Sequence, residues 1–249
     1  MNIYNQILEN KAKGNKMFAL LIDPEKCSDE WLHQIISTVN SQQKTNDTQL
    51  FIFVGGSQFK ESVFDIVKKI KTLTSVPVVM FPRDASQFAE NVDALLFLSL
   101  ASGRNSKYLI EQHIKAAPLI KKTNIETIAT GYILIDGGKQ TAVERISHTS
   151  PYLIEDIETI TNTSIACQLL GHKMVYLEAG SGANRAVPEN IIKATRQNID
   201  IPLIIGGGIK SVEQMNLAFR SGADIVVVGN HIESHPEDLP ILLEAVKQI

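Results

Sequence analysis

The chain has 249 residues, of which 44% are apolar and 20% charged, and its formal net charge is −3. This is the composition of an ordinary folded protein, which excludes a disordered chain and the strongly basic face of nucleic-acid-binding proteins. All apolar runs are far shorter than the roughly 20 residues of a membrane-spanning helix.

The two cysteines, Cys27 and Cys167, lie far apart in the sequence and form no C-x-x-C pair. A zinc site or a disulfide framework is therefore not indicated. The first sixteen residues carry polar and charged side chains throughout and lack the apolar stretch of a signal peptide. We expect a cytoplasmic protein without a nucleic-acid partner or an integral membrane segment.

Short apolar runs recur along the chain, most of them ending next to Gly, Pro, Asp or Asn. Uninterrupted runs of this kind are typical of parallel strands that are buried on both faces. Eight runs fit this description: Met17–Ile22, Leu50–Val54, Pro77–Phe81, Ala94–Leu100, Thr127–Ile135, Met174–Leu177, Pro202–Ile205 and Asp224–Val228.

Amphipathic patterns between these runs predict helices. They cover Asp29–Asn40, Gln58–Thr72, Lys107–Lys121, Ser150–Leu170, Pro188–Gln197 and Val212–Ser221. Ser211 is expected to cap the last of these helices and Gly222 to end it. The stretch from Arg83 to Asp93 is short, so we expect little helix between the third and fourth strands.

Eight strands that alternate with helices in about 250 residues predict a (β/α)₈ or TIM barrel, as a single domain over residues 1–249. A doubly wound open sheet is the competing architecture. It would need a topological switch point and usually has fewer strands, so we favour the barrel.

In such barrels the active site lies at the C-terminal ends of the strands, often with a phosphate site after strands seven and eight. The seventh predicted strand runs into Gly206-Gly207-Gly208, and the eighth is followed by Gly229 and Asn230. Glycines let the backbone approach an oxyanion closely, and successive N–H groups can form an anion nest. These turns predict a phosphate site, although they could also serve only as tight turns.

The sixth strand runs into Glu178-Ala179-Gly180-Ser181-Gly182, and Tyr176 shares one side of the strand with Glu178 by the two-residue period. Glu178 could accept a proton from a substrate hydroxyl, although a solvated glutamate at the rim is the simpler reading of this residue alone. Asp23 follows the first strand and Ser57 the second. A carboxylate and a hydroxyl would suit Mg²⁺ held partly by substrate phosphates, although a turn or a helix cap is the favoured reading of Asp23 taken alone. Phe97, Leu98 and Leu100 of the fourth strand are most simply core, with an apolar groove as the alternative.

The strand ends carry the motifs LIDPEK, FVGGS, LFLSLAS, YLEAGSGA, PLIIGGGI and ADIVVVGN, in this order along the chain. With them the sequence resembles the geranylgeranylglyceryl phosphate synthase family, which includes the heptaprenylglyceryl phosphate synthases. The stretch from Phe81 to Asn105 looks most like the form found in bacteria and some archaea.

The resemblance implies an Mg²⁺-dependent prenyltransferase that joins sn-glycerol 1-phosphate to a prenyl diphosphate, with geranylgeranyl diphosphate favoured, through an ether bond. It implies Asp23 and Ser57 as Mg²⁺ ligands and Glu178 as the base, with Tyr176 beside it. The implied glycerol phosphate site comprises Tyr176, Leu177, Glu178, Ala179, Gly180, Ser181, Gly182, Gly207, Gly208, Gly229 and Asn230. It also implies a homo-oligomer, either a dimer or a hexamer. Lys26, Arg83 and Arg104 are candidate partners for diphosphate oxygens.

Two other functions fit the same barrel. One is a phosphate-binding isomerase or synthase of amino-acid biosynthesis, with Asp23 and Asp136 as an acid–base pair on different strands. The other is a non-catalytic protein that binds a phosphorylated metabolite. Simple phosphate binding needs neither Asp23 nor Glu178, which argues against the second.

Overall fold

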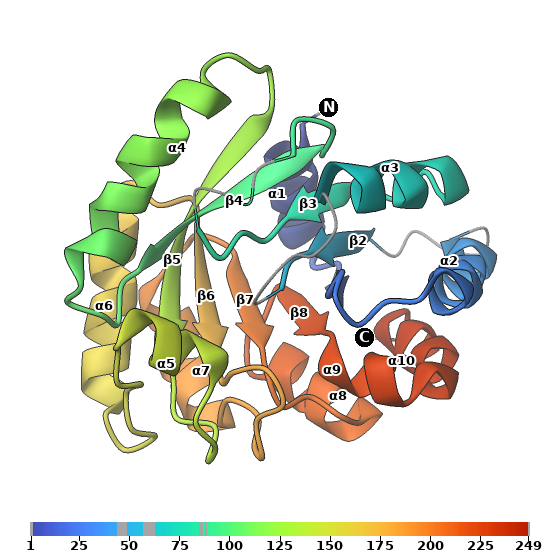
Figure 1. Ribbon diagram of the computed structural model, residues 1–249. Coiled ribbons are helices and arrows are strands. Elements are labelled where there is room, and N and C mark those ends of the chain that lie inside the picture. The colour runs from blue at the N-terminus through green and yellow to red at the C-terminus, as the bar shows by residue number, and fades with distance from the viewer. Residues whose placement is uncertain (1, 44–48, 57–62, 85–86, 88, 249) are drawn as a thin grey trace.

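The computed structural model describes residues 2–43, 49–56, 63–84, 87 and 89–248. Its eight parallel strands pair in sequence order and close on themselves, with β1 joined to β8 (Figure 1). The strands are β1 (Met17–Ile22), β2 (Gln49–Val54), β3 (Val78–Met80), β4 (Ala94–Leu100), β5 (Glu126–Leu134), β6 (Met174–Glu178), β7 (Leu203–Gly206) and β8 (Ile225–Val228). The predicted (β/α)₈ barrel is therefore confirmed, and the open sheet is wrong.

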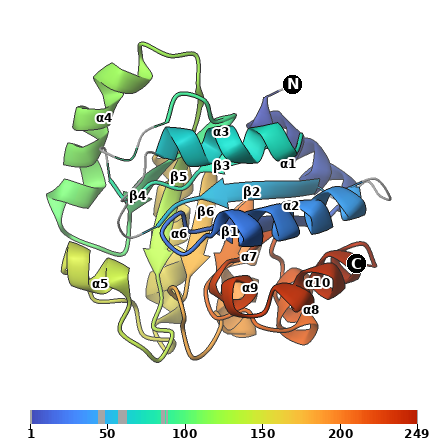
Figure 2. The same ribbon diagram turned by 45° about the vertical axis from the view of Figure 1, so that its right-hand side comes forward.

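The helices surround this barrel (Figures 1 and 2). They are α1 (Ile3–Lys13), α2 (Asp29–Gln43), α3 (Val63–Leu73), η1 (Lys107–Glu111), α4 (Gln112–Ile120), α5 (Ala142–Ser147), α6 (Ile157–Leu169), α7 (Glu189–Asn198), α8 (Val212–Arg220), α9 (Asn230–Ser234), η2 (Pro236–Asp238) and α10 (Leu239–Val246). None of the helices in the described ranges combines the length and the hydropathy that crossing a bilayer demands.

Several helix predictions needed correction. The helix predicted from Ser150 begins only at Ile157, because Tyr152 first pairs with Ile135 as a short extension beside β5. The helix predicted from Lys107 opens with a π-helical turn before α4. The elements α1, α5, α9, η2 and α10 were not predicted. Ser211 caps α8 as expected, with its hydroxyl accepting the Gln214 N–H, and Gly222 follows the helix with φ of 118°.

The strands separate two apolar cores because their side chains alternate between the faces of the sheet. Phe18, Leu20 and Ile22 of β1 pack outward against the helices, whereas Met17 and Ala19 belong to the core inside the barrel. Ile3 and Ile7 of α1 are buried in this inner core. Since Glu126 at the start of β5 accepts the N–H groups of Ile3 and Tyr4 at 2.5 and 3.0 Å, α1 covers the N-terminal end of the barrel.

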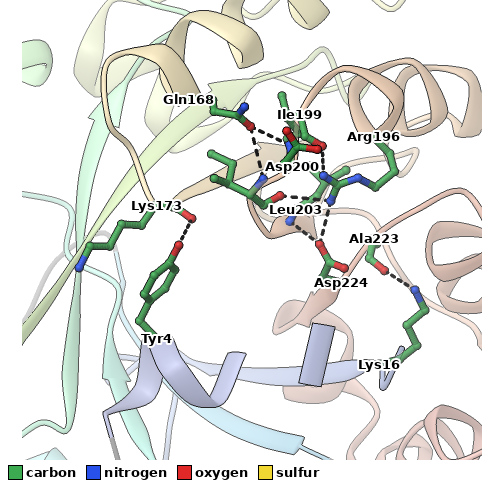
Figure 3. A network of polar contacts seen from close by, with 11 residues as sticks. Tyr4, Lys16, Gln168, Lys173, Arg196, Ile199, Asp200, Leu203, Ala223 and Asp224 are labelled. Carbon is green, nitrogen blue, oxygen red and sulfur yellow. Dashed lines mark hydrogen bonds and ion pairs between the residues drawn. The ribbon is translucent and has the colours of Figure 1, made fainter. Parts of the chain in front are cut away.

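A polar network ties the strands together at this N-terminal end (Figure 3). The Arg196 guanidinium of α7 lies 3.0 Å from Asp224 Oδ2, which also accepts the Leu203 N–H at 2.8 Å. Lys16 Nζ donates to the Ala223 carbonyl at 2.9 Å. In such barrels the N-terminal end serves stability, whereas the active site lies at the C-terminal end.

Candidate active site

A cavity of about 290 Å³ opens at the C-terminal ends of the strands. Of the predicted site residues it is lined by Asp23, Tyr176, Glu178, Gly180, Ser181, Gly182, Gly207, Gly208, Gly229 and Asn230. Two predicted residues do not line it: Leu177 and Ala179 pack in the outer core. Ser57 lies outside the described residues. The structure thus brings residues from β1, β6, β7 and β8 to one cavity.

Glu178 and Tyr176 lie at the floor of this cavity. They sit two residues apart on β6, so both side chains point into the barrel while Leu177 points outward. Tyr176 is 1% exposed and Glu178 6% exposed. A carboxylate almost fully removed from water is costly unless it is hydrogen-bonded or protonated.

The Glu178 carboxylate has two donors. Its Oε1 accepts the Gly180 N–H at 2.7 Å, and Tyr176 provides a side-chain hydrogen bond. Burial nevertheless dominates and raises the pKa of Glu178 to about 7. Burial also raises the pKa of Tyr176 well above its ordinary value, so this phenol stays a donor. A carboxyl group with a pKa near neutrality can exchange protons with a substrate hydroxyl.

The glycines at the end of β7 and directly after it are required by close packing against these two side chains. A Cβ on Gly206 would lie 2.2 Å from the Tyr176 hydroxyl, and one on Gly207 would lie 2.4 Å from Glu178 Oε1. Gly207 and Gly208 also have φ of 81° and 71°, in the left-handed region that favours glycine. The turn therefore brings bare backbone against the buried carboxylate.

The turns after β6 and β8 meet on one side of the cavity. Gly180 and Gly182 have positive φ values of 102° and 69°. The Ser181 hydroxyl donates to Asn230 Oδ1 at 2.5 Å, which joins the two turns. Three glycine turns from adjacent strands thus surround one space with backbone groups, as an anion nest requires.

Asp23 lies at the rim after β1. Its Oδ1 accepts the Glu25 N–H at 3.1 Å, and its Oδ2 is 3.7 Å from Lys26 Nζ. The carboxylate packs against Gly56, where a Cβ would lie 2.2 Å from Oδ1. Among the described residues no group of three or more His, Cys, Asp and Glu side chains could hold a metal ion. A single carboxylate still fits Mg²⁺, which commonly takes one or two carboxylates and fills its remaining positions with water and substrate phosphates.

The far part of the cavity is apolar. Leu96, Leu98 and Leu100 of β4 line it, together with Phe97 of the same strand. Tyr108, Ala116, Val143 and Ile146 from the surrounding helices continue this lining. Of the two readings of β4, the structure therefore favours the apolar groove.

Several lining residues were not singled out from the sequence. Tyr132 of β5 lies opposite Tyr176 in the strand register, and the two rings are 5.3 Å apart with Phe81 close to both. His113 packs edge-on against Phe97 and lies 3.3 Å from the Ser99 hydroxyl. The inward position of Tyr132 could have been found from strand periodicity, whereas that of His113 depends on how its helix packs.

Of the remaining charged candidates, two line the cavity and two lie outside it. Lys26 and Arg83 line the cavity. Arg104 does not belong to the lining, and its guanidinium donates to the Ala101 and Gly103 carbonyls instead. Asp136 is also outside the lining and pairs with Arg185 at 2.5 Å. Asp23 and Asp136 therefore do not form the acid–base pair of the isomerase alternative.

Comparison with known proteins agrees with this geometry. The sequence matches the PcrB family over residues 5–248. The geranylgeranylglyceryl phosphate synthase of Flavobacterium johnsoniae is 46% identical over 93% of this chain and 94% of its own length. That of Pyrococcus furiosus is 33% identical over 91% of this chain and 88% of its own.

Solved structures give the same result. The crystal structure of (S)-3-O-geranylgeranylglyceryl phosphate synthase from Thermoplasma acidophilum, in complex with its substrate sn-glycerol-1-phosphate, has a TM-score of 0.91 at 29% identity and covers 100% of both chains. The wild-type protein from Thermoplasma volcanium has a TM-score of 0.90 at 30% identity, over 100% of this chain and 99% of that one. The chain belongs to the PcrB family and, like its relatives named geranylgeranylglyceryl phosphate synthase, is an enzyme of the prenyltransferase class.

Proposed function

We propose that this chain, as one barrel domain, joins sn-glycerol 1-phosphate to a prenyl diphosphate through an ether bond, with geranylgeranyl diphosphate as the favoured donor. One observation carries the proposal. A buried carboxylate, three glycine turns and the Asp23 carboxylate border the same cavity, which continues into an apolar groove. Each part matches one part of the two substrates.

The glycerol phosphate would bind at the turns after β6, β7 and β8. The backbone N–H groups there suit a phosphate. The glycines of these turns have no side chain to block a ligand, and those after β6 and β7 have positive φ values. The glycerol hydroxyls would then lie toward the cavity floor, where Glu178 is hydrogen-bonded to Tyr176. The crystal structure of the Thermoplasma acidophilum protein in complex with sn-glycerol-1-phosphate supports this choice of substrate.

The diphosphate would lie at the Asp23 side of the rim, and the prenyl chain along β4. Lys26 and Arg83 provide positive charge in this part of the lining, and Leu96, Leu98 and Leu100 provide the apolar surface. Mg²⁺ would be held by Asp23, with Ser57 as a further proposed ligand. When bound, the ion neutralises charge that builds up on the departing diphosphate.

In the reaction, the bond between the allylic carbon and the diphosphate oxygen breaks, and the diphosphate leaves with the electron pair. The glycerol hydroxyl oxygen forms the ether bond to that carbon, and its proton passes to Glu178. Tyr176 orients the carboxylate throughout because its own pKa keeps it protonated. The apolar side chains of β4 would keep water from the allylic cation, which would otherwise be hydrolysed.

The non-catalytic alternative does not explain the buried Glu178, because a phosphate-binding site gains nothing from a nearby negative charge that burial makes costly.

We also propose that the chain forms a homo-oligomer, a dimer or a hexamer. In support, Ile110, Ile114 and Leu119 on η1 and α4 are 54%, 64% and 46% exposed. Clusters of exposed apolar side chains often mark protein contacts. A cytoplasmic location stays a prediction.

The direct test mixes purified protein with sn-glycerol 1-phosphate, Mg²⁺ and prenyl diphosphates of graded length. Mass spectrometry of the organic phase should detect the prenyl ether. Two controls are sn-glycerol 3-phosphate, which tests the stereochemistry, and a chelator, which tests the metal. Absence of ether product with every prenyl length would remove the proposed reaction.

A further inference from the structure

Glu233 is a cavity-lining carboxylate that has no role in the reaction described so far. It lies on α9, three residues after Asn230, and its side chain is 13% exposed. A carboxylate that is largely withdrawn from water at a substrate cavity needs partners to offset its lost hydration.

The partners of Glu233 belong to the two different substrate sites. Its Oε2 accepts Lys26 Nζ at 2.8 Å and Asn230 Nδ2 at 3.3 Å. Lys26 is also 3.7 Å from Asp23 Oδ2, on the proposed diphosphate side. Asn230 Oδ1 accepts the Ser181 hydroxyl at 2.5 Å, on the proposed glycerol phosphate side. A continuous polar chain, Ser181–Asn230–Glu233–Lys26–Asp23, therefore runs along the rim from β6 to β1.

Glu233 Oε2 contacts both Lys26 and Asn230, so it influences the side chains at both ends of this polar chain. The closer contact of Lys26 is with Glu233 rather than with Asp23. Without the Glu233 carboxylate, the Lys26 ammonium would turn to Asp23 as its remaining negative partner in the chain. That contact would occupy the carboxylate needed for the metal. The Asn230 amide would lose the acceptor that fixes its orientation, and its contact with Ser181 would no longer be defined.

We infer that Glu233 is a positioning residue that couples the two substrate sites, holding Lys26 away from Asp23 and orienting Asn230 toward Ser181. The inference rests on the proposed function, because it assigns the two ends of the chain to the two proposed substrates. It also predicts that one substitution at Glu233, which touches neither reacting atom, weakens the binding of both substrates.

The test compares Glu233→Gln, Glu233→Ala and Lys26→Met with wild type. Glu237→Gln serves as the control because Glu237 is a nearby glutamate whose side chain is 67% exposed. The measurements are KM for each substrate, kcat, and calorimetric binding of sn-glycerol 1-phosphate and of inorganic diphosphate with Mg²⁺. Glu233→Ala should weaken both binding reactions at least 5-fold and raise both KM values, with a smaller effect on kcat. Glu233→Gln keeps the side-chain volume and an acceptor oxygen, so its effects should be intermediate. This variant also provides the test if Glu233→Ala does not fold.

A double-mutant cycle separates positioning from a general loss of structure. If Glu233 acts on the diphosphate through Lys26, adding Glu233→Ala to Lys26→Met should weaken diphosphate binding no further, while glycerol phosphate binding still falls. Wild-type binding of both ligands by the Glu233 variants, or additive effects on diphosphate in the cycle, would overturn the inference. Because these measurements report binding, they remain decisive if the wild-type protein makes no ether, an outcome that removes the proposed reaction alone.

Discussion

Tyr176 and Glu178 are hydrogen-bonded to each other inside the barrel, directly beside the glycine turn that follows β7. The pair places a carboxyl group of pKa about 7 next to a phenol that stays protonated. The donor and the acceptor are thus fixed before any substrate binds, which reduces reorganisation during the reaction.

Glu178→Gln should abolish most of the turnover. The amide can still accept the Gly180 N–H but cannot take a proton from the glycerol hydroxyl, and a general base typically contributes a factor of about 10²–10⁴. We expect kcat to fall by about this factor while calorimetric affinity for sn-glycerol 1-phosphate changes little. In the wild type, kcat/KM should rise with pH through an apparent pKa of about 7. A flat profile across that range would contradict the assignment of the base.

The same substitution should stabilise the protein at alkaline pH. Burial raises the pKa of Glu178 from 4.5 to about 7, so the folded state binds more protons than the unfolded state between these values. Stability contributed by the neutral form is therefore complete below about pH 4.5 and is lost as pH rises through about 7. Glu178→Gln should raise the unfolding free energy at pH 8 by up to about 3 kcal/mol, with no gain at pH 4. Urea unfolding at both pH values measures the difference, and an equal shift at both would refute the linkage.

Asp23→Asn should remove Mg²⁺-dependent turnover while leaving glycerol phosphate binding intact. The amide oxygen is a weaker metal ligand than a carboxylate, and the hydrogen bond of Asp23 is with the Glu25 N–H rather than with the turns after β6, β7 and β8. We expect at least a 100-fold loss in kcat/KM for the prenyl diphosphate. Asp29→Asn is the matched control because Asp29 lies on α2 and its side chain is 68% exposed. Turnover by Asp23→Asn at the wild-type rate would exclude Asp23 from the metal site.

Gly207→Ala and Gly14→Ala separate backbone strain from damage to the site. The two glycines have nearly the same φ, 81° and 78°. An added Cβ on Gly14 meets nothing within 4 Å, whereas one on Gly207 lies 2.4 Å from Glu178 Oε1. Both variants should lose about 1–2 kcal/mol of stability from the left-handed backbone, and Gly207→Ala should lose more because its Cβ would also lie 2.5 Å from the Gly180 backbone nitrogen. Only Gly207→Ala should also lose activity, by about 100-fold or more, and equal activities would refute the packing argument.

Asp224→Asn should destabilise the protein without altering its kinetics. Asp224 pairs with Arg196 and accepts the Leu203 N–H at the N-terminal end of the barrel, opposite the cavity. Removing the charge leaves a partly buried guanidinium without its anionic partner, although the Ile199 and Ile201 carbonyls still accept from it, and this should cost about 2–4 kcal/mol. Thermal unfolding should show the loss, while KM and kcat at 25 °C stay at wild-type values. Altered KM values in the folded variant would mean that the two ends of the barrel are coupled.

The barrel, its eight strands and the strand ends that line the site could all be predicted from the amino-acid sequence. Apolar runs are sufficient for this because strands buried on both faces exclude polar residues along their length. Glu178, Asp23 and the glycine turns were identifiable because each interrupts such a run at a strand end. Elements without this signal, among them α1 and α9, were missed, and the helix predicted from Ser150 began too early because Tyr152 pairs with Ile135.

The folded structure was needed to show which of these residues lie together. The closure of β8 onto β1 brings Glu233 to Lys26, which are 207 positions apart in the sequence. The structure also places Asp136 outside the cavity, in an ion pair with Arg185, and shows that Arg104 donates hydrogen bonds to nearby carbonyls. The shift in the pKa of Glu178 is likewise a property of the fold, because it comes from the exclusion of water by surrounding strands. Local sequence can specify a strand end, but distances across a closed sheet and the burial of a charge depend on all the strands at once.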